Sequence, residues 1–134
     1  MEISIQIDSL LVQRKLDKVL EKNNDWSQEL FDSGILLMRS FDLNFAMQGR
    51  PKRWTRSQAA INRNGMTLEN TGRLRRSFTA FTSDNNFDLK HSSLSISSNV
   101  PYDKYLQPKW PFLMIQEEDV NNIINIFRNS IEAL

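Results

Sequence analysis

Residues 68–78 read "LENTGRLRRSF", and this stretch decides how the middle of the chain folds. Asn70-Thr71-Gly72 has the composition of a turn, and Gly72 can adopt a positive φ at little cost. Gly72 is also one of only four glycines in the chain, and it directly follows a polar run. The stretch therefore predicts a turn that leads the chain out of a loop and into ordered structure. Three arginines crowd the exit of this turn: Arg73, Arg75 and Arg76.

Upstream of the turn, the apolar spacing predicts one strand, two helices and a long loop. Apolar residues alternate with polar ones over 2–7, which is typical of a half-buried strand. Helical spacing predicts helices over about 9–22 and 26–48, the second with one broad apolar face. Residues 49–71 have no clear period and hold at most one helical turn, near 57–62. A loop of this length is typical of a functional or a disordered segment.

Downstream of the turn, we predict a small sheet followed by a helix. Residues 73–76 are expected to form a helical turn, and 77–83 a strand with Phe78 and Phe81 as its large residues. Strands over 87–90 and 94–98 should then form an antiparallel hairpin or meander. The clean apolar stripe over 116–133 predicts a long C-terminal helix with acidic residues in its first turn.

This order of elements predicts an α+β fold with helices packed on a small antiparallel β-sheet. The chain of 134 residues is 40% hydrophobic and 25% charged, which suits a single domain over 1–134 with one core. Within Trp26–Gln48, Gly34 is expected to weaken the helix unless a neighbour packs closely against it. The expected core residues are Phe41, Phe45, Leu74, Phe78, Phe112, Ile124 and Phe127.

The composition argues against several kinds of chemistry. Without cysteine the chain has no disulfide, no thiolate metal site and no cysteine nucleophile. His91 is the only histidine and is expected on the surface, and no phosphate-binding glycine loop occurs. We therefore expect no enzyme, no cofactor and no metal. The N-terminus lacks the pattern of a signal peptide, and no stretch reaches the length of a membrane span.

Positive charge is concentrated in the middle of the chain. Residues 50–76 carry eight basic residues and one acidic residue, a net +7, whereas the remainder carries nine basic and fifteen acidic residues, a net −6. A basic segment with a tryptophan suits a nucleic-acid backbone, because charge and a stacking surface lie side by side. The alternative is a solvated loop with Trp54 in the core or at a subunit interface. The candidate interface or DNA-facing residues are Arg50, Lys52, Arg53, Trp54, Arg56, Arg73, Arg75 and Arg76.

Four sequence pieces occur in a fixed order along the chain. A proline and a tryptophan mark the loop, a T-G-x-L-x-x-S signature follows, then a V-x-Y segment, and a W-P-F-L piece opens the last helix. This series resembles the phage virion morphogenesis family, the Mu-like tail-completion proteins, from end to end. The residues that carry the resemblance are Pro51, Trp54, Leu68, Thr71, Gly72, Leu74, Ser77, Phe78, Val100, Tyr102, Trp110, Pro111, Phe112 and Leu113.

The resemblance implies a non-enzymatic structural protein of a tailed phage or prophage. Such a protein acts in tail completion and head–tail joining through contacts between subunits. It would be found in the tail or neck of the virion, and in the host cytoplasm during assembly. Its implied partners are tail or head–tail connector proteins and further copies of itself in a ring, with no membrane. The arginines after Gly72 would face a neighbouring subunit or the DNA in the neck channel.

Two departures from the family pattern accompany the resemblance. The family usually has a His-Gln-Phe-Gly-Gly-like stretch after the tyrosine segment, whereas Leu106-Gln107-Pro108 runs almost directly into "KWPFL" here. The tryptophan loop also carries basic residues in place of the usual glycines. Two alternative functions stay open at this point: a nucleic-acid-binding module that uses residues 50–76, and a transient assembly chaperone.

Overall fold

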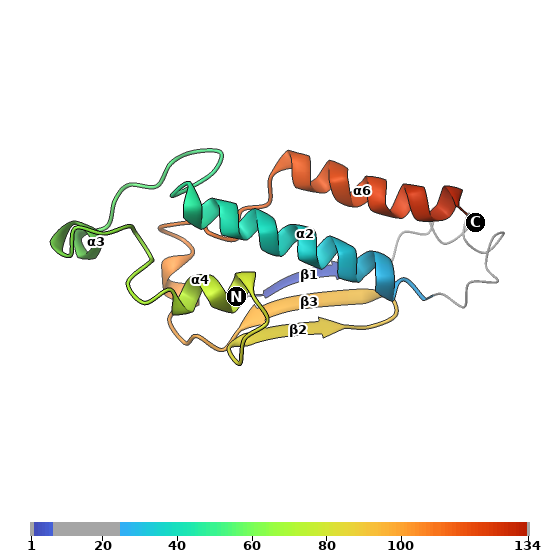
Figure 1. Ribbon diagram of the computed structural model, residues 1–134, viewed down its shortest axis with the longest axis horizontal. Coiled ribbons are helices and arrows are strands. Elements are labelled where there is room, and N and C mark those ends of the chain that lie inside the picture. The colour runs from blue at the N-terminus through green and yellow to red at the C-terminus, as the bar shows by residue number, and fades with distance from the viewer. Residues whose placement is uncertain (1, 7–24, 134) are drawn as a thin grey trace.

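The computed structural model describes residues 2–6 and 25–133 (Figure 1). It has an α+β fold in which helices pack on a small antiparallel sheet, as predicted. The predicted helix over 9–22 lies outside the described residues. The elements are β1 (Glu2–Gln6), α2 (Ser27–Ala46), α3 (Gln58–Asn62), α4 (Arg73–Thr79), β2 (Asn85–Leu89), β3 (Ser93–Ser98), α5 (Asp103–Leu106) and α6 (Glu117–Glu132).

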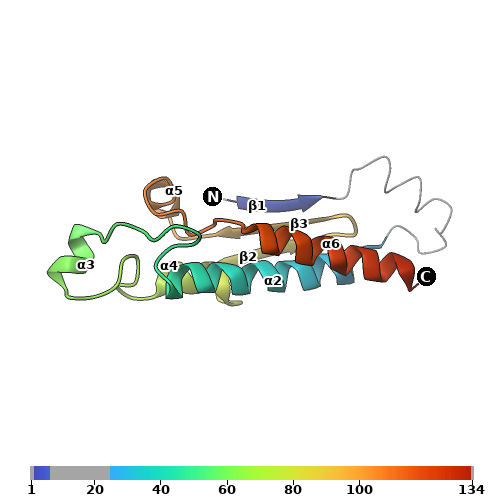
Figure 2. The same cartoon turned by 90° about the horizontal axis from the view of Figure 1, so that it is seen from above.

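The sheet has three strands in the order β1-β3-β2, and both neighbouring pairs are antiparallel. Its central strand β3 alternates between buried and half-buried residues, because Leu94 and Ile96 face the helices while serines face the other side. Strands near 2–7, 87–90 and 94–98 were predicted, and all three form. Figures 1 and 2 show α2 running along the sheet with α6 beside it, and α3 projecting beyond one end.

Helix α2 supplies the largest part of the core. Leu30, Leu37, Phe41 and Phe45 are almost completely buried and follow the helical spacing that predicts this element. Gly34 makes the close approach possible, because a Cβ atom there would lie 2.6 Å from Leu94 and 2.7 Å from a ring carbon of Phe87. The weakening effect of glycine on the helix is thus offset by tight packing of helix on sheet.

The predicted strand over 77–83 is wrong, because helix α4 covers 77–79 and residues 80–83 form no strand. Gly72 precedes the helix with φ +75°, so the turn expected from the sequence does form. Leu74, Ser77 and Phe78 then lie on one buried face, at the three- and four-residue spacing of a helix. Phe81, expected to be a large residue of the strand, follows the helix and is 59% exposed.

The long C-terminal helix α6 forms as predicted, but its core residues differ from the expectation. Ile124 is 47% exposed and does not belong to the core, whereas Phe127 is half-buried against it. Ile124 is exposed because α6 lies at the border of the helical layer and packs mainly on α2 (Figure 2). Its first turn is a capping box, in which the backbone N–H of Gln116 donates to Asp119 Oδ2 over 2.9 Å.

Candidate functional site

The loop after α2 folds back on the helix around Trp54. Gly49 takes φ +113°, and an added Cβ atom would lie 2.6 Å from the carbonyl oxygen of Lys52, so only glycine fits. The backbone N–H of Trp54 donates to the carbonyl oxygen of Gln48 over 2.7 Å. The Trp54 ring meets Phe45 edge-on, with 5.9 Å between ring centroids. Trp54 is therefore half-buried against the core, and its ring is not a free stacking surface.

Arg50 lies inside a polar network rather than in solvent. Its Nη2 donates to the carbonyl oxygen of Ser40 over 2.8 Å and to Ser40 Oγ over 2.7 Å. Its Nε donates to Asn44 Oδ1 over 2.9 Å. Ser40 Oγ in turn donates to Asp119 Oδ2 over 2.5 Å. The network joins the loop, α2 and the first turn of α6, so these contacts account for Arg50 without any external partner.

We expect the Arg50→Ala variant to lose about 1–3 kcal/mol of unfolding free energy, because buried hydrogen-bonding groups of Ser40 and Asn44 lose their partner. Urea unfolding measures this loss. Lys52→Ala and Arg53→Ala are the controls, since both side chains are exposed and should change stability by less than about 0.5 kcal/mol. Equal stability of all three variants would contradict the structural role of Arg50.

The rest of the loop, up to Thr67, is closed by long-range hydrogen bonds. Gln48 Oε1 accepts from the backbone N–H of Thr67 over 2.7 Å, and Gln48 Nε2 donates to the Thr67 carbonyl oxygen over 3.1 Å. Arg56 Nη2 donates to the carbonyl oxygen of Gly65 over 2.9 Å and so closes the turn around α3. The side chain of Arg63 donates to the carbonyl oxygen of Met66. The predicted helical turn near 57–62 is confirmed as α3.

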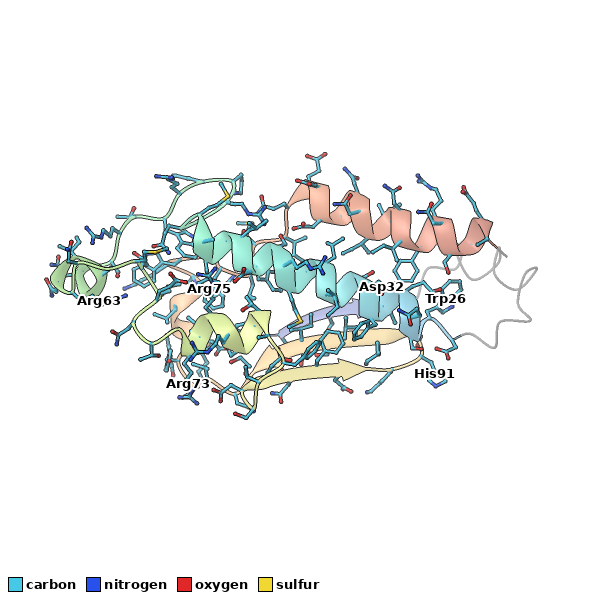
Figure 3. All side chains as sticks on the ribbon, viewed as in Figure 1. Trp26, Asp32, Arg63, Arg73, Arg75 and His91 are labelled. Atoms are coloured by element: carbon cyan, nitrogen blue, oxygen red, sulfur yellow. The ribbon has the colours of Figure 1, made fainter. Side chains whose placement is uncertain are left out.

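Arg73 and Arg75 point to opposite sides of α4 (Figure 3). Arg73 forms a two-pronged pair with Asp84 over 2.9 and 3.1 Å, in the turn before β2. Arg75 bridges α4 to α2 through Asp42 Oδ1 over 2.8 Å, and it also pairs with Glu69. The hydrogen bond from Arg73 lowers the pKa of Asp84, and the bonds to Asp42 and Glu69 raise the pKa of Arg75. Both arginines thus have acidic partners within the chain.

The Arg73–Asp84 pair should give a pH-dependent part of the stability. The pKa of Asp84 in the folded protein lies below its ordinary value of 3.8, so the contribution is present above pH 3.8 and is lost as the pH falls through the folded-state pKa. We expect Asp84→Asn to lower Tm at neutral pH, and this difference from the unsubstituted chain should shrink in strong acid. Thermal unfolding followed across pH measures it. A difference that stays constant down to strong acid would contradict the pairing.

Among residues 2–6 and 25–133, three basic side chains of the segment make no hydrogen bond or ion pair. Lys52 and Arg53 are exposed on the loop, and Arg76 is exposed on α4. A Cβ atom on Gly72 would lie 2.7 Å from Arg76 Nη1, so this guanidinium covers the glycine of the turn. Of the eight basic residues over 50–76, these three are the ones whose side chains are not held by a bond within the described residues.

The residues of the four sequence pieces divide between the core and the surface. Ser77 and Phe78 of α4 are fully buried, and Ser77 Oγ donates to the carbonyl oxygen of Leu74 over 2.6 Å. Phe112 is also fully buried, and its carbonyl oxygen accepts from Asn44 Nδ2 over 2.9 Å. Leu74, Val100 and Leu113 complete this buried set.

Residues of the last three sequence pieces, including the buried Leu74, meet at one groove. A hollow of about 440 Å³ lies between the α3 loop, the turn before α4 and the segment around α5. Trp110 ties two of these parts together, because its Nε1 donates to the carbonyl oxygen of Thr55 over 2.8 Å. The lining residues include arginines and no acidic side chain. Those that belong to the four sequence pieces are Leu68, Thr71, Gly72, Leu74, Tyr102 and Trp110.

The sequence did not place this groove, although it pointed to many of its residues. Leu68 takes φ +63°, a rare conformation for a leucine, and packs partly against the core beside Leu74. Tyr102 is 40% exposed and lies at the start of α5. Ala59 and Leu106 are further groove residues that no pattern indicated. Pro111 is half-buried next to Trp110 and does not line the groove.

The described residues also bear on a metal site, a histidine site and a membrane span. Within residues 2–6 and 25–133, acidic and histidine side chains form no group of three or more that could hold a metal ion. His91 is exposed, and its Nδ1 lies 3.9 Å from Asp25 Oδ1. None of the helices described combines the length and the apolar content that crossing a membrane requires. Comparisons with protein-family models, with curated proteins and with solved structures found no match to this chain.

Proposed function

We propose that this chain is a non-enzymatic structural protein of a tailed phage or prophage that acts in tail completion and head–tail joining. The proposal starts from the resemblance of its four sequence pieces to the virion morphogenesis family. Its partners are tail or head–tail connector proteins, and it works at the neck of the particle. The protein acts through surface contacts with these neighbours.

One observation carries the proposal: sequence pieces far apart along the chain meet at the same groove. The turn at 70–72, Tyr102 and Trp110 come from separate segments and line one hollow. The surface of the groove is largely apolar and open to solvent, and Arg63 and Arg73 are among its lining residues. A concave apolar surface of this kind suits an inserted side chain of another protein. The buried residues of the same pieces hold α4 and the groove wall on the core.

The alternative of a nucleic-acid-binding module has less support. Five of the eight basic residues over 50–76 donate to partners within the chain, and Trp54 packs against Phe45. The remaining candidates are Lys52, Arg53 and Arg76. If they bound DNA, a DNA fragment would be retarded at low salt, and the retardation would weaken steeply as salt is added. It would disappear when all three residues were changed to alanine.

The alternative of a transient assembly chaperone is tested by mass spectrometry of purified particles. A chaperone would be missing from them, whereas a structural protein would be present.

Electron microscopy of lysates from a phage or inducible prophage that lacks this gene tests the proposal. We expect filled heads beside unattached or abnormal tails. Supplying the intact gene from a plasmid should restore joined particles. Normal, infectious particles without the gene would overturn the proposal.

A further inference from the structure

The outer edge of strand β2 is unpaired in the described part of the chain. In the strand order β1-β3-β2, β2 hydrogen-bonds to β3 on one side only, and Figure 1 shows it at the outer rim of the sheet. An edge strand presents backbone N–H and C=O groups that another strand can pair with. The question is which strand fits this edge.

Aromatic side chains gather beside the same edge. The Phe87 ring, on the helix side of β2, contacts Phe31 and Phe81 edge-on, with centroid distances of 5.8 and 5.2 Å. Phe81 is 59% exposed and Phe31 is 37% exposed. Exposed aromatic rings next to an unpaired edge give a surface that gains from burial.

We propose that the edge pairs with a second copy of this chain, with β2 antiparallel to β2 and a two-fold axis at Phe87. The two three-stranded sheets then form one six-stranded sheet, and the aromatic clusters of both copies meet at the axis. Directly opposite residues in an antiparallel pair have their side chains on the same face. This inference does not rest on the proposed phage function.

The charges on the other face of β2 favour this partner and this register. Asn86 and Asp88 are the exposed residues of β2, and Lys90 is exposed directly after the strand, whereas Asp84 lies in the turn before it and is bonded to Arg73. With the axis at Phe87, Asn86 lies opposite Asp88 of the second copy, and Lys90 lies opposite Asp84 of the second copy. No like charges oppose each other.

Neighbouring registers are worse. An axis at Asp88 would place two copies of this carboxylate directly opposite each other. An axis at Asn86 would place two copies of this amide opposite each other and would lose both amide–carboxylate pairs. Like charges directly opposite destabilise a strand pair, so the charges select the register centred on Phe87. Shifting one strand by a single residue, so that the axis falls between two residues, would turn the apolar faces of the two copies to opposite sides of the sheet.

Sedimentation equilibrium of the purified chain tests the proposal. The unsubstituted protein should dimerise in a concentration-dependent manner. Asn86→Asp places two like-charged pairs in each dimer and should raise the dimer Kd roughly tenfold. The swap variant, Asn86→Asp with Asp88→Asn, restores an amide–carboxylate pair at each position and should return the Kd to near its original value.

The swap also separates pairing from folding. Asn86 Nδ2 donates to Asn99 Oδ1 over 2.8 Å, and both variants lose this bond equally. Recovery of the dimer in the swap variant therefore comes from restored charge pairing across the interface. Phe81→Ser should weaken the dimer independently, by removing an exposed ring from the cluster. A monomer up to millimolar concentration would overturn the proposal, as would a dimer that none of these variants affects.

Discussion

Phe112→Ala is expected to destabilise the protein by about 3–5 kcal/mol. The ring is fully buried and lies between Phe45 and Phe78, with 5.5 Å between centroids on each side. It thus joins α2 and α4 to the segment that leads into α6. Removing it leaves a cavity at the junction of three segments, which the surrounding side chains fill only in part. Chemical denaturation with circular dichroism gives the change in unfolding free energy.

Ile124→Ala is the matched control for this substitution. The sequence predicts Ile124 as a core residue, for which the same change would cost about 2–5 kcal/mol. Because the side chain is 47% exposed on α6, we expect a change within about 0.5 kcal/mol instead. A large loss for Ile124→Ala, or a loss below about 1 kcal/mol for Phe112→Ala, would contradict the core described above.

Asn70→Trp should block assembly while leaving the fold intact. Asn70 is exposed and lines the groove, so a tryptophan there fills space that an incoming side chain would need. We expect the yield of infectious particles to fall by orders of magnitude in a complementation assay with the gene deleted. The unfolding free energy should change by less than about 0.5 kcal/mol, because the substitution lies on the surface.

Asn121→Trp is the control for the groove variant. Asn121 is exposed on α6 and does not line the groove. It adds the same bulk away from the groove, so assembly should proceed as with the original chain. Equal particle yields from Asn70→Trp and the original chain would show that the groove is not a docking surface.

The spacing of apolar residues was sufficient to predict the long helices, because each carries several turns of a regular apolar face. Helix α2 is twenty residues long and buries one continuous face, so its pattern is unambiguous. Segment 73–79 is short, and the spacing of its large residues fits a turn, a helix or the start of a strand. The helix forms because Leu74 and Phe78 pack into the core. The local sequence does not show what these two side chains pack against.

The groove depends on contacts between residues far apart in the sequence. Gln48 forms a hydrogen bond with Thr67, and Trp110 forms one with Thr55. No local sequence pattern predicts either pair, because the partners are far apart in the chain. The same holds for Arg50, whose partners lie on α2. The sequence therefore did not separate the arginines that hold the fold from the basic residues whose side chains form no bond within the described part of the chain.

The most direct test of the assembly role is to add the purified protein to a lysate of the phage that lacks its gene. Infectious titre and micrographs are then compared for the original chain and for Asn70→Trp. We predict that the original chain joins heads to tails and restores the titre, and that the groove variant does not. A lysate that is already fully infectious, or one in which the added protein joins no particles, would contradict the role in tail completion and head–tail joining.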